Sequence, residues 1–410
     1  MTHALRQSAS DTHLHPRPLA VTRLALTNFR SYARAELALS GRPVALAGAN
    51  GAGKTNLLDA LSLLSPGRGL RGARLAEHTR KAPQSAGSDV LWAVSATIQR
   101  HGENYEIGTG LRRALATSAA QMGLVSSIEG AEKRQVHLNG APAQNSADLG
   151  EIVQMAWLTP AMDRLFSDSA SGRRRFLDRL VLGFDPTHAR RSLRYEQAMR
   201  ERARLLRLGP RDPGWLAALE NEMAEAGIEI AAARARAVER LNGELARREQ
   251  AGAFPSAQLA LAGETDRVFA EKGEQSVETQ RAALAGARLR DAESRRTTIG
   301  PHLSDLLARH TEKRMDARDC STGEQKALLI AIVLANAWEL GRSRGGHAPL
   351  LLLDEIAAHL DARRRAALFE EIVALGAQAW LTGTDLSLFE NLAGRADIFL
   401  VEASQITRQN

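Results

Sequence analysis

The chain is short of the residues that would place it in an oxidising compartment or in a membrane. It has 1 cysteine, Cys320, which excludes an intramolecular disulfide and favours a reducing compartment. No apolar run reaches about eighteen residues, so a transmembrane helix is excluded. Aromatic residues make up 4% against 44% for all hydrophobic residues, so the cores must be aliphatic. We therefore expect a cytoplasmic α/β protein without membrane association.

The first twenty residues differ in composition from the rest of the chain. They lack the apolar core of a signal peptide, contain few acidic residues and are rich in His, Arg, Ser and Pro. A transit peptide shares this composition and stays open as an alternative. We predict a disordered extension over residues 1–20.

Basic residues slightly outnumber acidic ones, 54 against 47, which gives a formal net charge of +7. So small an excess over 410 residues is compatible with an ordinary basic surface. A phosphate-rich partner such as DNA or RNA is the alternative, because clustered arginines release counterions from a phosphate backbone. Arginines cluster over 173–175, 190–194 and 200–207. The cluster over 173–175 supplies our candidate nucleic-acid contacts, Arg173, Arg174 and Arg175.

Hydrophobic periodicity predicts an α/β head that is interrupted by a helical arm. Residues 21–39 alternate like two short strands around a turn at 28–31. Asp212 and Pro213 have the chemistry of a helix start, and an apolar stripe follows from Trp215 to Leu245 with a spacing of three or four residues. This stripe predicts a helix of roughly 30 residues, about 45–50 Å long. We assign residues 21–172 and 291–410 to the head and 173–290 to the arm.

Residues 48–55, GANGAGKT, match the phosphate-binding pattern GxxxxGK[ST] between a predicted strand and a predicted helix. The glycines let successive backbone N–H groups point at phosphate oxygens, and the positive end of the helix adds to them. We expect Lys54 to reach the β- and γ-phosphates of ATP and the Thr55 hydroxyl to bind Mg²⁺. The predicted nucleotide contacts of this segment are Gly48, Ala49, Asn50, Gly51, Ala52, Gly53, Lys54, Thr55 and Asn56.

Residues 350–355, LLLLDE, predict a buried parallel strand followed by two carboxylates. The carboxyl ends of such strands are where open α/β sheets bind ligands. We expect Asp354 to hold Mg²⁺ with Thr55, and Glu355 to activate the attacking water as the catalytic base. A loop that caps a helix could contain the same two residues. We interpret the pair as a metal and catalytic site because the phosphate-binding loop lies upstream in the same chain.

Residues 321–326, STGEQK, open an apolar run with Ser321 three residues before Glu324. This spacing is a capping box, in which the serine caps the helix and the glutamate reaches back, and helix-start chemistry alone would explain it. A helix N-terminus beside Gly323 is also an anion site. The chain therefore has two helix ends suited to phosphate.

The STGEQK segment resembles the signature motif of ABC-type ATPases, with Thr322 in place of the first of two usual glycines. The resemblance implies a two-nucleotide sandwich dimer, in which Ser321 and Gly323 of one subunit cover the γ-phosphate held by the other. It makes Ser321 a catalytic residue and places Asp361 in the dimer-contacting D-loop. The switch histidine that the superfamily has after its last core strand is missing here, where Gly383, Thr384 and Asp385 follow AWLT. Gln154 precedes its strand and is not assigned to a Q-loop.

Five segments of the chain occur in the same order as in one family of these ATPases, which makes the resemblance more specific. LALTNFRSY, RRRFLDRL, GPHLSDLL, STGEQKA and LLLLDEIAAHLDARRR together resemble the RecF family of DNA gap-repair ATPases over about residues 21–400. Leu303 departs from the family, which commonly has arginine at that position. The resemblance implies ATP-driven homodimerisation on DNA at single-strand/double-strand junctions, weak DNA-stimulated hydrolysis that releases the DNA, and help in loading RecA. It also implies RecR and RecO as partners.

Three other functions share part of this pattern. The nucleotide-binding subunit of a transporter has both phosphate motifs, but it normally keeps the switch histidine and lacks so long a helical insertion. A chromosome-organising SMC protein needs coiled-coil arms of hundreds of residues. A scaffold with a degenerate ATP site is disfavoured because Lys54, Thr55, Asp354 and Glu355 are all present.

Overall fold

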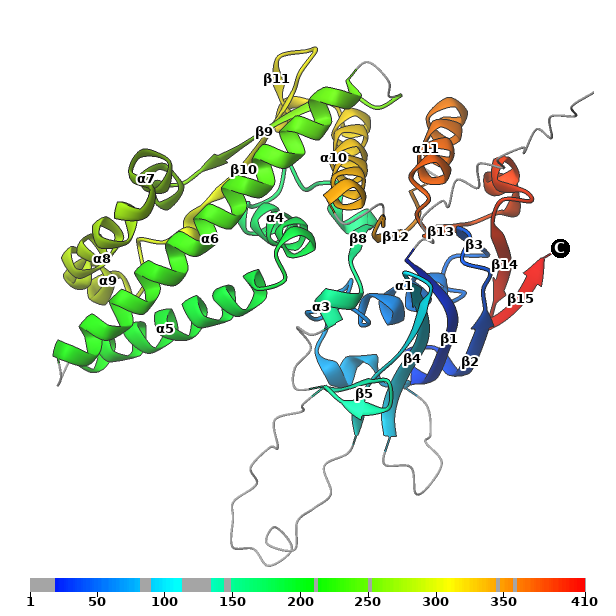
Figure 1. Ribbon diagram of the computed structural model, residues 1–410, viewed down its shortest axis with the longest axis horizontal. Coiled ribbons are helices and arrows are strands. Elements are labelled where there is room, and N and C mark those ends of the chain that lie inside the picture. Colours follow the sequence, from blue (N-terminus) through cyan, green and yellow to red (C-terminus); the bar gives the residue numbers. More distant parts are fainter. Residues whose placement is uncertain are drawn as a thin grey trace, which may run out of the picture.

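A computed structural model describes residues 19–81, 90–112, 134–143, 149–209, 213–249, 253–343, 347–356 and 360–409. The chain forms a head of two six-stranded sheets and an elongated helical arm, which lie at opposite sides of Figure 1. Within the described residues, no helix is both long enough and apolar enough to cross a membrane. The predicted extension over 1–20 and the N-cap at Asp212 lie almost entirely outside these residues, which include only Leu19 and Ala20 of the extension.

The central sheet of the head is parallel except at one edge. Its order is β15(Gln405–Gln409)-β14(Asp397–Glu402)-β3(Val44–Ala47)-β13(Ala379–Gly383)-β12(Leu350–Leu353)-β8(Met155–Leu158), and β15 is the antiparallel member. All four leucines of β12 are buried, because both faces of a parallel sheet are covered. Leu351 and Leu353 pack into one hydrophobic core and Leu350 and Leu352 into another, as the two-residue period of a strand requires.

The two faces of this sheet are covered by different layers. One core contains residues of α4(Ala170–Phe184), α10(Thr322–Ser343) and α11(Ala362–Leu375). The other contains residues of α1(Lys54–Ser62) and of the second six-stranded sheet, which is antiparallel. That second sheet runs in the order β2(Tyr32–Ala38)-β1(Ala20–Phe29)-β4(Val90–Arg100)-β5(Glu103–Arg112)-β6(Gln135–Leu138)-β7(Ala141–Pro142). The predicted strand pair over 21–39 is thus β1 and β2, and Asn28 and Arg30 have the positive φ of a tight turn.

The arm is built on one long helix, α6(Pro213–Arg248). Its 36 residues confirm the predicted long helix, which is about 54 Å at the rise of an α-helix. α5(His188–Leu208), α7(Glu264–Lys272), α8(Ser276–Gly286) and α9(Arg288–Ser294) surround it (Figure 1). Residues 276–294 form two separate helices, α8 and α9, with Ala287 between them.

α6 belongs to two cores along its length. Met223 and Ile230 in its first half pack in the arm core with Tyr195 of α5. Ala237, Leu241 and other residues of its second half pack in the head core that contains α10. The long helix therefore links the arm to the head through buried side chains.

A three-stranded sheet, β11(Met315–Asp316)-β10(Asp305–His310)-β9(Ala257–Ala262), joins residues on both sides of the assigned arm boundary at 290/291. The sequence did not predict β9, whose AQLALA is only six residues long in a polar stretch. The remaining short elements are α3(Leu149–Ile152), η1(Leu75–His78), η3(Pro160–Met162), η4(Gly273–Gln275), η5(Pro301–Leu303), η6(Ala317–Asp319) and η8(Leu386–Leu392).

Candidate nucleotide site

The glycine-rich loop between β3 and α1 has backbone geometry that side chains would not permit. Gly48 and Gly53 have φ of 152° and 117°. A Cβ at Gly48 would lie 2.1 Å from the Val401 carbonyl oxygen, and one at Gly53 would lie 2.7 Å from the Tyr32 hydroxyl oxygen. Gly51 has φ of 82° and open space around it, so the outer side of the loop faces solvent. This loop can wrap its N–H groups around an anion at the start of α1.

Lys54 extends its side chain back into the loop. Its Nζ donates hydrogen bonds to the carbonyl oxygens of Gly48, at 2.5 Å, and Ala49, at 2.8 Å. The residue is 4% exposed, and burial lowers the pKa of its ammonium, an effect that Glu355 and Asp354 partly offset. The ammonium is thus already positioned where the loop would hold phosphate oxygens.

Thr55 and Asp354 meet at the carboxyl edge of the parallel sheet, as the sequence predicted. The Thr55 hydroxyl donates to Asp354 Oδ1 at 2.9 Å across 299 positions of the chain. Asp354 is 4% exposed, and burial raises the pKa of its carboxyl. A hydroxyl and a carboxylate beside a phosphate loop are suitable ligands for Mg²⁺, so these two residues fit the implied metal.

Thr382, at the end of β13, is a site residue that sequence reasoning missed. Its buried hydroxyl donates to Asp354 Oδ1 at 2.9 Å and accepts from the Glu355 backbone N–H at 2.7 Å. The signal that could have found it is the position of the polar pair Thr382–Gly383 after the apolar Ala379–Leu381, at the same edge as Asp354. Glu355 itself has φ of 54°, the left-handed conformation that non-glycine residues rarely adopt, and its side chain is half-buried. Residues in this conformation often lie in functional sites.

Two segments from opposite ends of the chain support the phosphate loop. The Tyr32 hydroxyl, in NFRSY, donates to the Gly53 carbonyl at 3.1 Å, and Asn56 Nδ2 donates to Ser31 Oγ at 2.9 Å. The Ser404 N–H, in the β14–β15 hairpin, donates to the Ala52 carbonyl at 2.9 Å. The sequence offered no pattern for the Ser404 contact, since it depends on how the hairpin packs.

The start of α10 forms the predicted capping box and faces solvent. The Ser321 N–H donates to Glu324 Oε2 at 3.0 Å, and the Glu324 N–H donates to Ser321 Oγ at 3.4 Å. Lys313 also contacts Glu324 and lowers the pKa of that carboxyl to about 2. Ser321, Thr322 and Gly323 are exposed, and a Cβ at Gly323 would have nothing within 4 Å.

Residues just inside α10 fasten this exposed end to the head. Gln325 Nε2 donates to the Cys320 carbonyl at 2.9 Å, and its Oε1 accepts from Ser167 Oγ at 2.9 Å. Lys326 Nζ lies 3.0 Å from Asp163 Oδ2. The helix end is therefore fastened to the head at Gln325 and Lys326, while Ser321, Thr322 and Gly323 are exposed to solvent.

The predicted D-loop residue Asp361 has a local role in the structure, and so do Asp385 and Gln154, to which the sequence assigned no function. Asp361 caps α11 by accepting from the Arg364 N–H at 2.8 Å and is exposed. Asp385 caps η8 in the same way, accepting from the Ser387 N–H at 2.8 Å. Gln154 Nε2 donates to the Gly150 carbonyl at 2.8 Å and is buried.

The three candidate DNA contacts differ in what they already bind. Arg173 forms a two-pronged ion pair with Asp305, 2.7 and 2.8 Å, and Arg174 donates to the Ser304 carbonyl at 2.7 Å. Arg175 is the exposed member. Leu303, where the family commonly has arginine, is 51% exposed.

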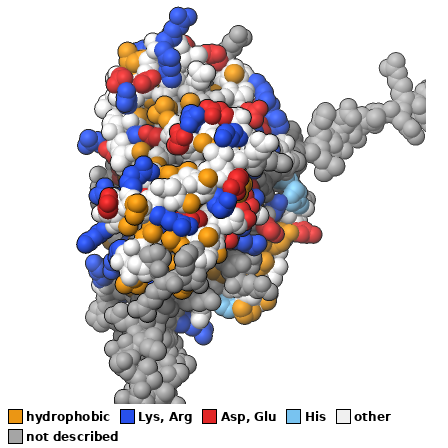
Figure 2. Space-filling view, turned by 90° about the vertical axis from the view of Figure 1, so that its left-hand side faces the viewer, with side chains coloured by type: hydrophobic (Ala, Val, Ile, Leu, Met, Phe, Trp, Pro, Cys, Tyr) orange, Lys and Arg blue, Asp and Glu red, His pale blue; other side chains and the backbone are white. Residues whose placement is uncertain are grey.

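Several arginines of the later clusters serve the arm itself. Arg202 is fully buried and bound to Glu220 and Asp291, and Arg194 lies 2.5 Å from Glu222. Figure 2 looks at the end of the arm, where the described basic, acidic and hydrophobic side chains are interspersed. Much of the positive charge read from the sequence is therefore neutralised within the arm.

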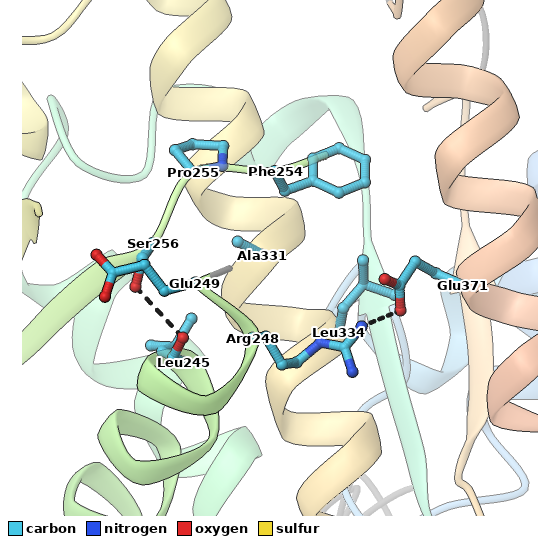
Figure 3. A pocket seen from close by; sticks show the side chains of 9 residues that line it. All are labelled: Leu245, Arg248, Glu249, Phe254, Pro255, Ser256, Ala331, Leu334 and Glu371. Carbon is cyan, nitrogen blue, oxygen red and sulfur yellow. Dashed lines mark hydrogen bonds and ion pairs between the residues drawn. The ribbon is translucent and has the colours of Figure 1, made fainter. Parts of the chain in front are cut away.

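A contact at the other end of α6 joins the arm to both helices that follow the signature and D-loop segments. Arg248 of α6 pairs with Glu371 of α11, and its guanidinium lies 4.7 Å from the centre of the Trp338 ring of α10. Trp338 Nε1 also donates to Glu371 at 3.1 Å. Figure 3 shows Arg248 and Glu371 facing each other beside Leu334 in a small pocket where the three helices meet. Arg248 therefore connects the arm helix α6 directly to α10 and α11.

Known proteins share this fold. The chain superposes on the "Structure of the recombination mediator protein RecF-ATP in RecFOR pathway" with a TM-score of 0.80 and 20% identity, covering 97% of this chain and 100% of that one. An Smc head domain from Pyrococcus furiosus gives a TM-score of 0.51 at 17% identity over 96% of each chain. Similarity at this level of identity shows a common fold.

Closer relatives show the family. A protein of Rhizobium etli (strain CIAT 652) named "DNA replication and repair protein RecF" is 46% identical over 391 residues, which is 95% of this chain and 99% of the relative. Its namesake in Mesorhizobium japonicum is 48% identical over 388 residues, 94% of this chain and 97% of the relative. The family model described as "RecF/RecN/SMC N terminal domain" matches residues 20–406. The chain therefore belongs to the RecF family of SMC-like ABC ATPases.

Proposed function

We propose that this protein is an ATP-dependent DNA-binding protein of recombinational gap repair. ATP binding would join two copies on DNA at single-strand/double-strand junctions, where they would help to load RecA, and hydrolysis would release them. The relatives named "DNA replication and repair protein RecF" and the ATP-bound recombination mediator of the same fold support this proposal. RecR and RecO are the partners that the family implies.

The observation that carries the proposal is a division of the phosphate-binding groups into two places. The loop over 48–55 contributes Lys54 and Thr55, and Thr55 bonds to Asp354. The Ser321 end of α10, by contrast, is fastened to the head through Gln325 and Lys326, and its first residues face solvent. Two copies that face each other would let the Ser321 end of each complete the loop of the other. Asp361, exposed at the start of α11, is our proposed dimer contact.

Each residue at the sheet edge has a distinct task in this proposal. The loop N–H groups and Lys54 would bind the phosphates, and Thr55 and Asp354 would hold Mg²⁺, which screens the charge on the phosphates when bound. Glu355 would accept a proton from the attacking water. Thr382 orients both acidic residues through one hydroxyl, because it contacts the Asp354 side chain and the Glu355 backbone. We expect the resulting hydrolysis to be weak and stimulated by DNA.

The length of the arm favours a DNA clamp over a chromosome-organising protein. α6 spans about 54 Å, so the arm is too short for the coiled coil of a full SMC protein. We propose residues 173–290 as the arm and Arg175 as a DNA phosphate contact, since Arg173 and Arg174 are engaged within the protein.

A DNA-binding titration tests the proposal. Binding to a duplex with a single-strand gap should require ATP and Mg²⁺, exceed binding to blunt duplex, and weaken steeply between low and moderate salt because phosphates are neutralised. Binding that ignores nucleotide and salt, or no binding to either DNA, would contradict it.

A further inference from the structure

A wide groove opens in the arm, away from the nucleotide site. It has a volume of about 1020 Å³ and lies between α6, the end of β9 and α7, which are neighbours in Figure 1. Its apolar lining comes from Val238 and Ala235 of α6, Leu261 of β9, and Phe269 and Ala270 of α7. An apolar groove of this size is suited to a ligand as large as a peptide segment.

The charged residues of the groove are mainly acidic. Glu239, Glu264 and Asp266 line it together with Arg267. Arg267 is neutralised by two glutamates, since its guanidinium lies 2.6 Å from Glu264 and 2.7 Å from Glu271. The groove therefore retains negative charge that a basic ligand would complement.

Asp266 is the most unusual of these residues. It is 7% exposed, and neither of its carboxylate oxygens has a hydrogen-bond partner among the described residues. Burial raises the pKa of this carboxyl, although Ser304 and Arg234 nearby oppose the rise. Gly263 leaves it room, because a Cβ there would lie 2.4 Å from Asp266 Oδ2. A buried carboxylate without a partner is costly, and a cationic side chain would remove that cost.

The strand at the groove has an open edge. β9 is the outermost strand of its sheet. Among the described residues, the Asn242 side chain bonds to its outer edge at Leu259, donating to the Leu259 carbonyl at 2.9 Å and accepting from the Leu259 N–H at 2.8 Å. Backbone groups of a strand face outward at every second residue, so Leu261 is the next to do so. Leu261 lines the groove, so an extended segment laid in it could pair with this backbone.

We propose that this groove is a docking site for an extended segment of a partner protein, in which a lysine or arginine between apolar residues reaches Asp266 while the backbone pairs with Leu261. The site is separate from the nucleotide site and does not depend on ATP. A carboxylate in the first turn also favours its own helix through the helix dipole, so the test must separate binding from helix stability.

Peptide binding to the full-length protein tests the proposal. The probes are short fluorescent peptides of alternating valine and threonine. In one peptide a lysine replaces a valine and in the other it replaces a threonine, so that the lysine side chain points to one face of the strand or the other. The matched controls carry norleucine in place of lysine. The lysine peptide should bind about tenfold more tightly than its control, which is the usual effect of one charge-assisted hydrogen bond. Asp266→Asn should abolish this preference, and Glu312→Gln, an exposed position outside the groove, should leave it intact. Equal binding of the two peptides, or no binding, would overturn the proposal.

Four further measurements decide the remaining outcomes. Asp266→Asn should keep or raise the melting temperature of the unliganded protein, because it removes an unpaired buried charge; a clear loss would mean that Asp266 serves α7 and would overturn the proposal. Gly263→Val should block the lysine peptide, because a side chain there would meet Asp266 Oδ2 and also the Ser304 Cα. Self-association through the groove, lost in Asp266→Asn, would identify a second copy as the occupant and would also overturn it. ATP binding by these variants shows whether the nucleotide site is intact, so failure here leaves the proposed function standing.

Discussion

The phosphate loop and the start of α10 are both helix N-termini suited to phosphate, but they differ in their surroundings and in their exposure to solvent. The loop is enclosed by its own chain, with Tyr32 and Ser404 bonded to it and Thr55 joined to Asp354. The start of α10 is mounted just as firmly by Gln325, yet Ser321 and Gly323 face solvent. The enclosed end of α1 can bind a phosphate with groups of its own chain. The exposed end of α10 is suited to a phosphate that is already bound to another molecule. This difference is the physical basis for our proposal that the two ends act across a dimer.

The largest expected effect comes from changing the enclosed side. Glu355→Gln removes the proton acceptor and should slow ATP hydrolysis by about a hundredfold or more while ATP-bound dimers accumulate. Steady-state phosphate release and dimer mass, measured together, check both parts. Glu312→Gln is the matched control, since Glu312 is exposed outside the nucleotide site. Normal hydrolysis by Glu355→Gln would remove Glu355 from catalysis.

Mixing two defective variants compares the two ends directly. Lys54→Ala disables the loop and Ser321→Arg blocks the exposed end, so each alone should be nearly inactive. In an equal mixture, half of the dimers are mixed and each has one intact composite site, so about a quarter of the wild-type ATPase activity should return. If each variant is inactive alone and no activity returns at any mixing ratio, the two ends do not act across a dimer.

A smaller effect should follow from loosening the enclosed side without removing a reacting group. Thr382→Val removes the hydroxyl that joins Asp354 and the Glu355 backbone, and the loss of these hydrogen bonds should reduce kcat about tenfold. Thr382→Ser keeps the hydroxyl and should recover most of the activity. If the valine and serine variants were equally active, the hydroxyl of Thr382 would have no part in catalysis and the residue would serve only in packing.

The smallest expected effect concerns the arm. Arg175→Gln should weaken binding to gapped DNA about threefold at low salt and reduce the salt dependence by roughly one phosphate contact. Arg204→Gln is the control, because Arg204 is also exposed but already pairs with Glu201 at 2.6 Å. Equal effects of the two substitutions would indicate a general loss of positive charge instead of a contact.

Motifs whose chemistry is local were predictable from the sequence, and contacts that depend on folding were not. The loop over 48–55, the Asp354–Glu355 pair and the Ser321–Glu324 capping box follow from short patterns with fixed geometry. The long α6 followed from its apolar stripe, although Trp215 at the start of that stripe is 48% exposed. Thr382 and Ser404 were missed because their partners lie far away in sequence.

Clusters of arginine in the sequence did not predict which arginines of the arm are exposed and unneutralised. Arg202 was counted in a basic cluster, yet it is fully buried between Glu220 and Asp291, which lie 18 and 89 positions away along the chain. Arg173 is likewise bound to Asp305. Because composition does not show which charges neutralise one another, only the structure separates Arg175 from its neighbours.

The central claim is that the Ser321 end of one copy completes the nucleotide site of another. Light scattering of the Glu355→Gln protein, with and without saturating ATP and Mg²⁺, measures it most directly. The account predicts a monomer without nucleotide, a dimer with it, and a return to monomer when Ser321→Arg is added. A protein that remains monomeric with bound ATP, while the wild type still hydrolyses ATP at its normal rate, would contradict it.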